Sequence, residues 1–168
     1  MMSKLTADPT LDRLLRHMEW ANATLFARLV ELPEAALALA APRNEWSVAM
    51  IVAHIVDAAA EYAGHLDGGA FPPASTPPAT VAEVAALAAA CASYDSRLRA
   101  VGAVSEGTVQ IGSRPRRRAR STILGQAIHH ATEHRAQIAG ALATNGIDAI
   151  DLDALDLWAY GIAEGLGA

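Results

Sequence analysis

The sequence has little cysteine, no long apolar run and no excess of basic charge. Its single cysteine, Cys91, cannot form an intramolecular disulfide, which excludes a disulfide-stapled scaffold and favours a reducing, cytoplasmic compartment. The longest uncharged apolar stretches reach about half of the ~18 residues that span a bilayer. No apolar run follows the positive charge near the N-terminus. We therefore expect neither secretion nor membrane insertion.

Basic side chains are outnumbered, 13 to 18 acidic ones, so the formal net charge is −5. This balance argues against a general nucleic-acid binder, whose affinity comes mostly from neutralising phosphates. Five of the basic residues lie between Arg114 and Arg120, where they could contact phosphates or an acidic partner. Because this segment has no interleaved aromatic residues and no nucleic-acid-recognition motif, we expect it to be a solvated loop.

A chain of 168 residues, 52% of them hydrophobic, is long enough to bury a core without staples and predicts one soluble domain spanning residues 1–168. Alanine and leucine dominate, and no repeat of 20 to 50 residues is visible. Such a composition favours close-packed helices over strands of β-branched residues. The predicted fold class is therefore all-α.

Apolar spacing, capping residues and breakers predict four long helices and a short C-terminal one. Ser47 is the expected N-cap of the second, Thr80 with Glu83 forms a capping box for the third, and Ser121 or Thr122 caps the fourth. The expected helices run over Leu11–Leu32, Val48–Leu66, Thr80 to Leu98 or Val101, Ser121 to Thr144, and Leu152–Ala163. A loop over Asp67–Pro78 and a short extended segment over Thr108–Ile111 are also expected. The pattern favours a four-helix bundle, in which cofactor sites lie between facing helices.

Three of the six histidines are candidates for metal binding. His130 and His134 lie four residues apart, so they project within about 40° of each other on one helix face, among apolar residues. His54 lies within the apolar run of the second helix and is also expected to point inward. Three inward imidazoles with one open coordination position are typical of a catalytic metal site. Equally, each could be a core histidine that is hydrogen-bonded to a neighbour.

Polar residues near these histidines could assist them. Asp57 and Glu61 lie close to the helix face of His54, where a carboxylate could orient a ligand imidazole or act as a base toward bound water. Gln126 and Gln137 flank the other two histidines as possible substrate or supporting contacts. Solvation, pairing or hydrogen bonding between helices would explain all four residues as well, so we assign none of them a catalytic role.

The remaining candidates are assigned structural places. Cys91 lies in an alanine-rich helix with no neighbouring cation in the sequence, so it is expected to be a small buried residue. Trp46 and the other large aromatic residues are expected to pack at amphipathic helix positions. His129 is expected to project away from the site, and His17 is left unassigned.

Several motifs together resemble one family of metal-dependent proteins. The run from His130 to Gln137 resembles the His-x-x-x-His-Arg-x-Gln signature of the DinB-like, or YfiT-like, family. Three more stretches resemble that family in the expected order: Trp20-Ala21-Asn22, Trp46-Ser47 followed by His54, and Asp151 through Tyr160. The resemblance spans about Leu11 to Gly161. The family often has glycine where this chain has Ala136, which is helix-compatible and puts no ligand in doubt.

The resemblance implies a four-helix bundle with a three-histidine site for a divalent metal such as zinc or nickel, carried here by His54, His130 and His134, and often a homodimer. Arg135 and Gln137 match the signature but are not ligands. Some members of the family resemble transferases that add a low-molecular-weight thiol to electrophiles, and others resemble thiol-dependent isomerases or hydrolases. The chain is thus expected to be a metal-dependent enzyme acting on a small molecule. The alternative is a non-catalytic metal-binding module of stress response or protein interaction.

Overall fold

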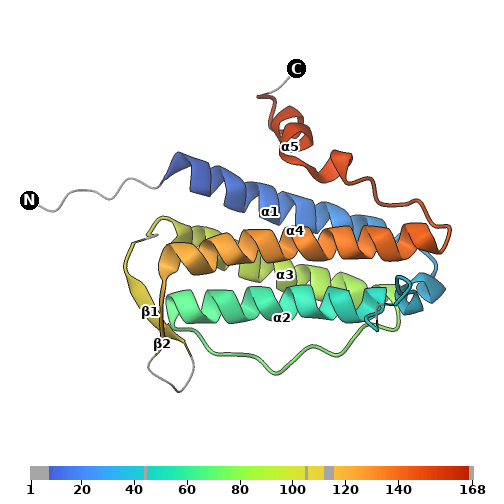
Figure 1. Ribbon diagram of the computed structural model, residues 1–168, viewed down its shortest axis with the longest axis horizontal. Helices are drawn as coiled ribbons and strands as arrows, with labels where there is room; N and C mark the ends of the chain where they lie inside the picture. Colours follow the sequence, from blue (N-terminus) through green and yellow to red (C-terminus); the bar gives the residue numbers. More distant parts are fainter. Residues whose placement is uncertain (1–7, 44, 105, 112–115, 167–168) are drawn as a thin grey trace, which may run out of the picture.

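The computed structural model describes residues 8–43, 45–104, 106–111 and 116–166. Four long α-helices lie side by side and make up most of the molecule (Figure 1). They are α1 (Pro9–Leu29), α2 (Val48–Asp67), α3 (Val81–Gly102) and α4 (Arg120–Thr144). Helices α1 and α2 each pack against both α3 and α4. The prediction of a mostly helical chain is confirmed, with one small sheet added.

Helix α1 begins two residues before the predicted start at Leu11. The Asp8 side chain accepts hydrogen bonds from the first free backbone N–H groups, and Pro9 occupies the first turn, where its missing N–H costs nothing. The helix also ends at Leu29 rather than at Leu32. The chain turns there, four residues before Pro33.

The expected caps of α2 and α3 are confirmed. Ser47 Oγ accepts a hydrogen bond from the backbone of Met50, and Gly68, at φ 74°, ends α2 in the left-handed conformation that glycine adopts without strain. Thr80 and Glu83 exchange both bonds of a capping box. These local signals fix the start of both helices and the end of α2.

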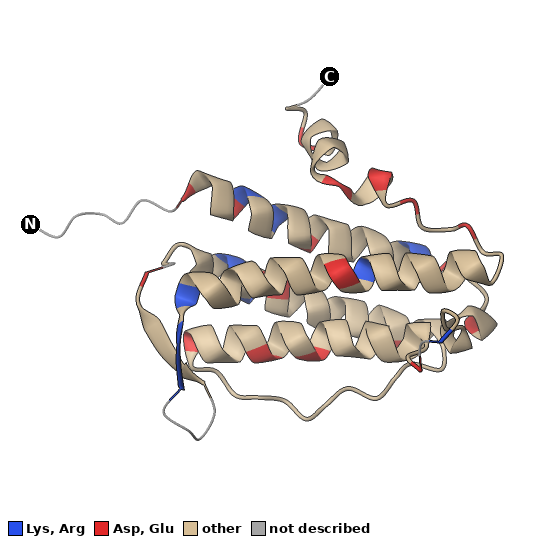
Figure 2. Ribbon diagram, in the orientation of Figure 1, with Lys and Arg blue, Asp and Glu red and all other residues tan. Residues whose placement is uncertain are grey.

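A two-stranded antiparallel hairpin packs against α2 and α4. The extended segment predicted over Thr108–Ile111 is confirmed as β1, but its partner β2 (Arg116–Ala119) was predicted as a solvated loop and is a strand. Arg114 and Pro115 of the basic segment lie outside the described residues. The arginines of β2 are exposed, as expected, and Figure 2 shows this strand as a basic stripe that leads into α4. Among its Lys, Arg, Asp and Glu residues, α2 carries only acidic ones.

The predicted cap of α4 at Ser121 or Thr122 is wrong. Ala119, the last residue of β2, directly precedes the helix and gives it no side-chain cap. The backbone N–H of Arg120 instead donates to the carbonyl of Gly107, so strand pairing satisfies a group that a cap would otherwise satisfy. The helix therefore starts earlier than its sequence signals indicate.

The C-terminal segment crosses α1 as two short helical pieces and not as the one predicted over Leu152–Ala163. A 3₁₀ turn, η2 (Asp153–Leu155), is followed by α5 (Leu157–Ala163). Asp156 between them is extended, and its side chain accepts a hydrogen bond from the backbone of Ala159. A good N-cap inside the predicted helix thus breaks it in two. A similar 3₁₀ turn, η1 (Glu34–Ala38), follows α1.

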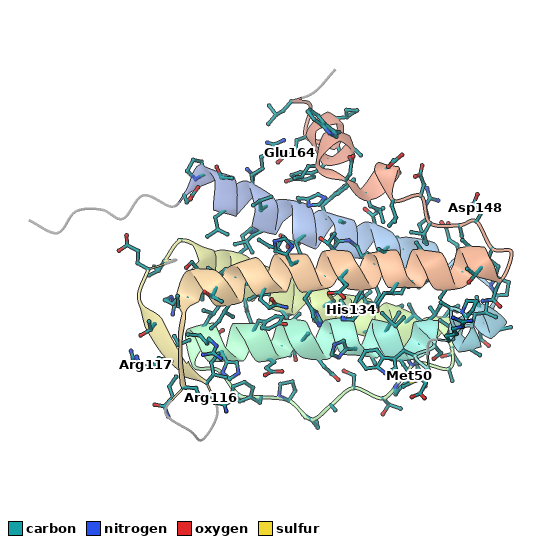
Figure 3. All side chains as sticks on the ribbon, viewed as in Figure 1. Met50, Arg116, Arg117, His134, Asp148 and Glu164 are labelled. Atoms are coloured by element: carbon teal, nitrogen blue, oxygen red, sulfur yellow. The ribbon has the colours of Figure 1, made fainter. Side chains whose placement is uncertain are left out.

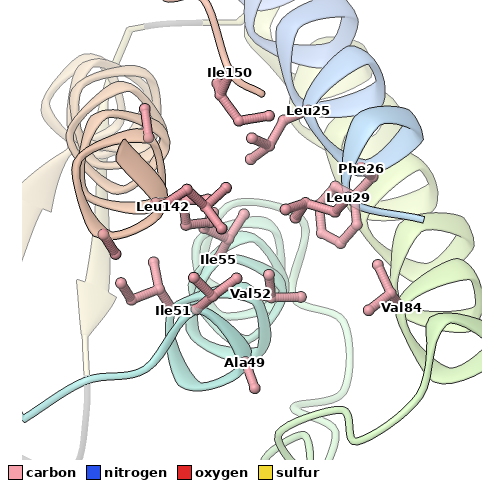
Figure 4. Close-up of a cluster of buried hydrophobic side chains, with 14 of the residues drawn as sticks. Leu25, Phe26, Leu29, Ala49, Ile51, Val52, Ile55, Val84, Leu142 and Ile150 are labelled. Carbon is pink, nitrogen blue, oxygen red and sulfur yellow. The ribbon is translucent and has the colours of Figure 1, made fainter. Parts of the chain in front are cut away.

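Two clusters of buried apolar side chains fill the space between the long helices. The first, which Figure 4 shows, includes Leu25, Leu29, Ile51, Val52 and Leu142. The second includes Leu15, Met18, Leu66, Leu98 and Leu124. Where the clusters meet, at about mid-length of the helices, lies a group of polar residues that we call the polar layer: Asn22, His54, Asp95, His130, His134 and Arg135. The two apolar clusters hold the polar layer from both sides.

Among the described residues, no helix combines the length and the apolar character needed to cross a lipid bilayer. This agrees with the absence of long apolar runs in the sequence.

Candidate metal centre

The structure brings the three predicted histidines together. His130 and His134 project from successive turns of α4, and His54 meets them from α2. The Nε2 atom of His130 lies 3.0 Å from Nε2 of His54 and 3.0 Å from Nε2 of His134. All three candidate ligand atoms lie within 4.8 Å of one another. Figure 3 shows His134 at mid-length of α4, on the side that faces α2.

The spacing of these nitrogens fits one small divalent ion. A tetrahedral ion with metal–nitrogen bonds of about 2.0–2.1 Å separates its nitrogen ligands by roughly 3.3 Å. The two separations that involve His130, each 3.0 Å, require a shift of only a few tenths of an ångström. Three neutral imidazoles leave further coordination positions free, and this donor set suits zinc or nickel. The site can therefore hold a metal ion and still bind water or substrate.

Burial favours the neutral, metal-binding form of two of these imidazoles, those of His130 and His54. It lowers the pKa of His130 to about 4, assisted by the neighbouring imidazoles of His134 and His54. Burial, followed by the charge of His134, also lowers the pKa of His54. A neutral imidazole has a free lone pair on one ring nitrogen, whereas a protonated one has none. The apolar surroundings therefore favour metal binding near neutral pH.

Gln137 orients one of the candidate ligands. Its Oε1 lies 2.8 Å from Nδ1 of His134, one turn along α4. Because an amide oxygen only accepts, Nδ1 must donate, which leaves the lone pair on Nε2 directed toward the other histidines. From the sequence, Gln137 was expected beside the site, either as a substrate or supporting contact or as a residue in hydrogen bonds between helices. The structure shows it in contact with the candidate ligand His134.

Replacing Gln137 should weaken metal binding without removing it. We expect Gln137→Leu to raise the Kd for Zn²⁺ by roughly 10- to 100-fold, since the imidazole of His134 loses the acceptor that fixes its tautomer. Competition titration against a coloured chelator measures this change. Gln110→Leu, the same substitution on the exposed side of β1, is the matched control and should leave Kd unchanged. Equal Kd values for the two variants would show that the contact with His134 is unimportant.

The carboxylates that we considered as orienting groups lie elsewhere. Asp57 Oδ1 accepts a hydrogen bond from the backbone of Ser75, and Glu61 lies 3.4 Å from Nε2 of His65. Within the described residues, neither carboxylate hydrogen-bonds to a candidate ligand. The hydrogen bond with Ser75 instead joins Asp57 to the chain that follows α2.

Trp46 covers the site, which its predicted place in a helix did not suggest. It precedes the cap of α2, and its ring centroid lies 4.8 Å from that of His54 and 6.1 Å from that of His134. Trp46 is 37% exposed, and its ring contacts His54 edge-on and stacks on His134, so the indole covers one side of the imidazoles. The sequence did contain a signal for this position. Trp46 immediately precedes the expected N-cap residue Ser47 and therefore lies outside the helix.

A buried hydrogen-bond network lies next to the histidines. Arg135 Nη1 donates to Asn22 Oδ1 at 2.7 Å, and Asn22 Nδ2 donates to Asp95 Oδ2 at 2.9 Å. The Cys91 thiol donates to the same carboxylate oxygen at 3.6 Å. All four residues are buried. The network therefore links α1, α3 and α4 through the centre of the molecule.

Asp95 was not among the predicted site residues, although its spacing gave a signal. It lies four residues after buried Cys91 and three before buried Leu98, so a carboxylate occupies the apolar face of α3. The prediction that Cys91 is buried is confirmed. Burial, followed by the negative charge of Asp95, raises the pKa of the Cys91 thiol well above its usual range. Cys91 is therefore a poor nucleophile, and thiol chemistry here would need an external thiol.

Asp95 should make stability depend on pH. Burial raises its pKa to about 6, so the folded state holds the proton more tightly than the unfolded state does. Between about pH 4 and pH 7, wild type should therefore lose roughly 2 kcal/mol of unfolding free energy relative to Asp95→Asn. Urea unfolding of both proteins across this range measures the difference. Parallel pH curves for the two proteins would contradict a raised pKa.

The remaining histidines play structural parts or lie at the surface. His17 is buried, with its Nε2 2.8 Å from the carbonyl oxygen of Leu155, and so holds the C-terminal segment against α1. His129 is exposed, as expected. Neither residue approaches the three candidate ligands.

The fold and the geometry define a class of protein: long helices packed around side chains that can hold a metal between facing helices. Comparison with family models then identifies the family. Residues 1–160 match the model of the DinB family, so this chain belongs to the DinB family. No curated protein shows significant similarity to the chain. Membership in this family agrees with the signature that runs from His130 to Gln137.

Proposed function

We propose that this protein is a divalent-metal-dependent enzyme that promotes attack by a low-molecular-weight thiol, or by water, on a small electrophile. The observation that carries the proposal is the convergence of three imidazoles, with Nε2 of His130 3.0 Å from Nε2 of both other histidines and all three candidate ligand atoms within 4.8 Å of one another. His54, His130 and His134 would hold the ion, with zinc or nickel the best matches to neutral imidazoles. The four long helices would form the four-helix bundle expected for the family.

The chain's own residues would prepare the reaction. A bound divalent ion supplies Lewis acidity, which lowers the pKa of a coordinated thiol or water. The three imidazoles contribute no charge and so leave the positive charge of the ion undiminished. Gln137 fixes the imidazole of His134 by accepting from its Nδ1. Trp46 excludes solvent from one side of the imidazoles.

A cavity of about 390 Å³ supports a small-molecule substrate. It begins about one turn along α2 from His54, and its walls are mainly apolar with two carboxylates. The lining residues are Asp57, Ala60, Glu61, His65, Phe71, Pro72, Ala74 and Ile111. A cavity of this size suits a ligand of metabolite size. Phe71 and Ile111 would contact its apolar part, and the carboxylates would favour a cationic or hydrogen-bond-donating group.

Two further proposals concern the setting of the enzyme. Apolar side chains on and just after α5 are exposed, with Trp158 84% exposed beside Ile162 and Leu166. An apolar surface of this kind favours association, and we propose a homodimer.

The single, buried cysteine is compatible with a reducing compartment, and we propose a cytoplasmic location.

The test is a screen of small electrophiles with several low-molecular-weight thiols, using metal-loaded, tag-free protein. We expect a thiol- and electrophile-specific rate that is lost in His130→Ala, because one of three ligands is removed. His129→Ala is the matched control, since it removes the adjacent, exposed imidazole and should keep the rate. Metal-dependent stability without turnover of any pair would instead favour the non-catalytic module.

A further inference from the structure

A small cavity lies at the centre of the molecule, behind the candidate metal centre. Its volume is about 10 Å³, which is about the room that one water molecule needs. All four long helices contribute to its walls, including the polar residues Asn22, Tyr62, Asp95 and His130. Apolar cavities stay dry, but one with several polar groups in its wall is suited to hold water.

One oxygen in this wall has no partner within the protein. Asp95 is 1% exposed, and its Oδ2 accepts from Asn22 and from Cys91. Its Oδ1 is fully buried and accepts no hydrogen bond within the described chain. A buried acceptor without a donor costs roughly 1–3 kcal/mol, and more when it is charged. Asp95 lines the cavity, which therefore offers room for a donor beside this carboxylate.

The wall of the cavity also contains His130, a metal-ligand candidate with an unused ring nitrogen. Nε2 of His130 faces the other two histidines, so its Nδ1 lies on the other edge of the ring. Unlike Nδ1 of His134, which contacts Gln137, it hydrogen-bonds to no group in the described residues. Histidine ligands of metals almost always donate their second ring N–H to an oxygen. His130 therefore lacks a partner that a working site requires.

We propose that the cavity binds one water molecule, which accepts from Nδ1 of His130 and donates to Oδ1 of Asp95. Asp95 is then a positioning residue that orients His130 through the water, as Gln137 orients His134 directly. The arrangement satisfies both unpartnered groups at once and explains why a carboxylate occupies the apolar face of α3. The part that concerns metal binding rests on the proposed function, whereas the bound water does not.

The first test is a crystal structure of the metal-free wild-type protein at high resolution, with Ala59→Val beside it. Ala59 lines the cavity from α2, and two added methyl groups should fill the space while leaving every polar group in place. We expect a water peak within hydrogen-bond distance of Asp95 Oδ1 in wild type and none in Ala59→Val. A dry cavity in wild type would overturn the inference, even with metal binding intact.

The second test measures the affinity for Co²⁺ and the visible absorption spectrum of the bound ion. Asp95→Asn should raise Kd roughly 10-fold and shift the spectrum, because the acceptor behind His130 loses its charge. Ala59→Val should do the same, and the double variant should add little more. Cys91→Ala is the matched control, because it removes a partner of Oδ2 and leaves the cavity lining unchanged.

The two tests separate failure of the inference from failure of the proposed function. Circular dichroism first establishes that each variant is folded. An Asp95→Asn protein with the affinity and spectrum of Cys91→Ala would overturn the positioning role. A wild-type protein that binds no Co²⁺ would overturn the proposed function and the positioning role together, whereas the water peak would still establish the bound water.

Discussion

Adding Zn²⁺ or Ni²⁺ at about 100 times its Kd should raise the free energy of unfolding of the tag-free protein by about 2.7 kcal/mol. The gain arises because three nitrogens from α2 and α4 converge only in the folded chain. His134→Ala should lose this gain, since the two remaining imidazoles hold the ion far more weakly. Urea unfolding with and without metal, and again after addition of a chelator, measures the effect.

His129→Ala is the control for this experiment. It removes an exposed imidazole beside the site and should keep the full metal-dependent gain. The same gain in His134→Ala as in wild type would mean that the ion binds at another place on the protein. No gain in wild type would reduce the three histidines to ordinary residues of the polar layer.

Asn22→Ala should destabilise the protein by about 3–5 kcal/mol, which is large for a single polar residue. Asn22 connects two buried charged residues, accepting from Arg135 and donating to Asp95. Alanine would leave a guanidinium and a carboxylate oxygen buried without these partners, and water reaches neither easily. The free energy of unfolding in urea, measured near neutral pH, gives the cost directly.

Thr24→Ala provides the comparison on the same helix. Its hydroxyl donates only to the carbonyl of Trp20, one turn earlier in α1, so its loss should cost less than about 1 kcal/mol. If Asn22→Ala also costs less than about 1 kcal/mol of unfolding free energy, the network does not hold α1, α3 and α4 together. A much larger loss of unfolding free energy in Asn22→Ala than in Thr24→Ala would support that role.

Much of the helical framework could be predicted because its signals are local. Ser47, Thr80 and Glu83 satisfy free backbone groups within one turn, so their effect does not depend on the rest of the fold. The meeting of His130 with His134 follows likewise from a spacing of four residues in a helix. His54 could be predicted only as inward-facing. Its approach to the other two depends on how α2 packs against α4.

The features that were not predicted depend on contacts between distant segments. The start of α4 is set by strand pairing across the hairpin, and no residue near Ser121 indicates that pairing. Trp46 reaches His54 and His134 because the chain turns immediately before α2. Asp95 acquires its role from Asn22, which lies 73 residues away in the sequence. Sequence patterns show which face a residue occupies, but not what meets it there.

The polar layer contains features that were predicted from the sequence and features that were not. The apolar clusters on either side make it expensive to keep charged or hydrogen-bonding groups there unless each has a partner. Hydrogen bonds join Arg135 to Asn22 and Asn22 to Asp95, and the three imidazoles converge on one another. A bound metal ion and a bound water would provide partners for the polar groups that remain.

Elemental analysis of the tag-free protein by inductively coupled plasma mass spectrometry tests the central claim most directly. The tag must be absent because a polyhistidine sequence would itself bind metal. We predict close to one divalent transition-metal ion per chain in wild type and in His129→Ala, and essentially none in His130→Ala. Wild-type protein without metal after reconstitution with zinc and with nickel, or His130→Ala with a full complement, would contradict the claim.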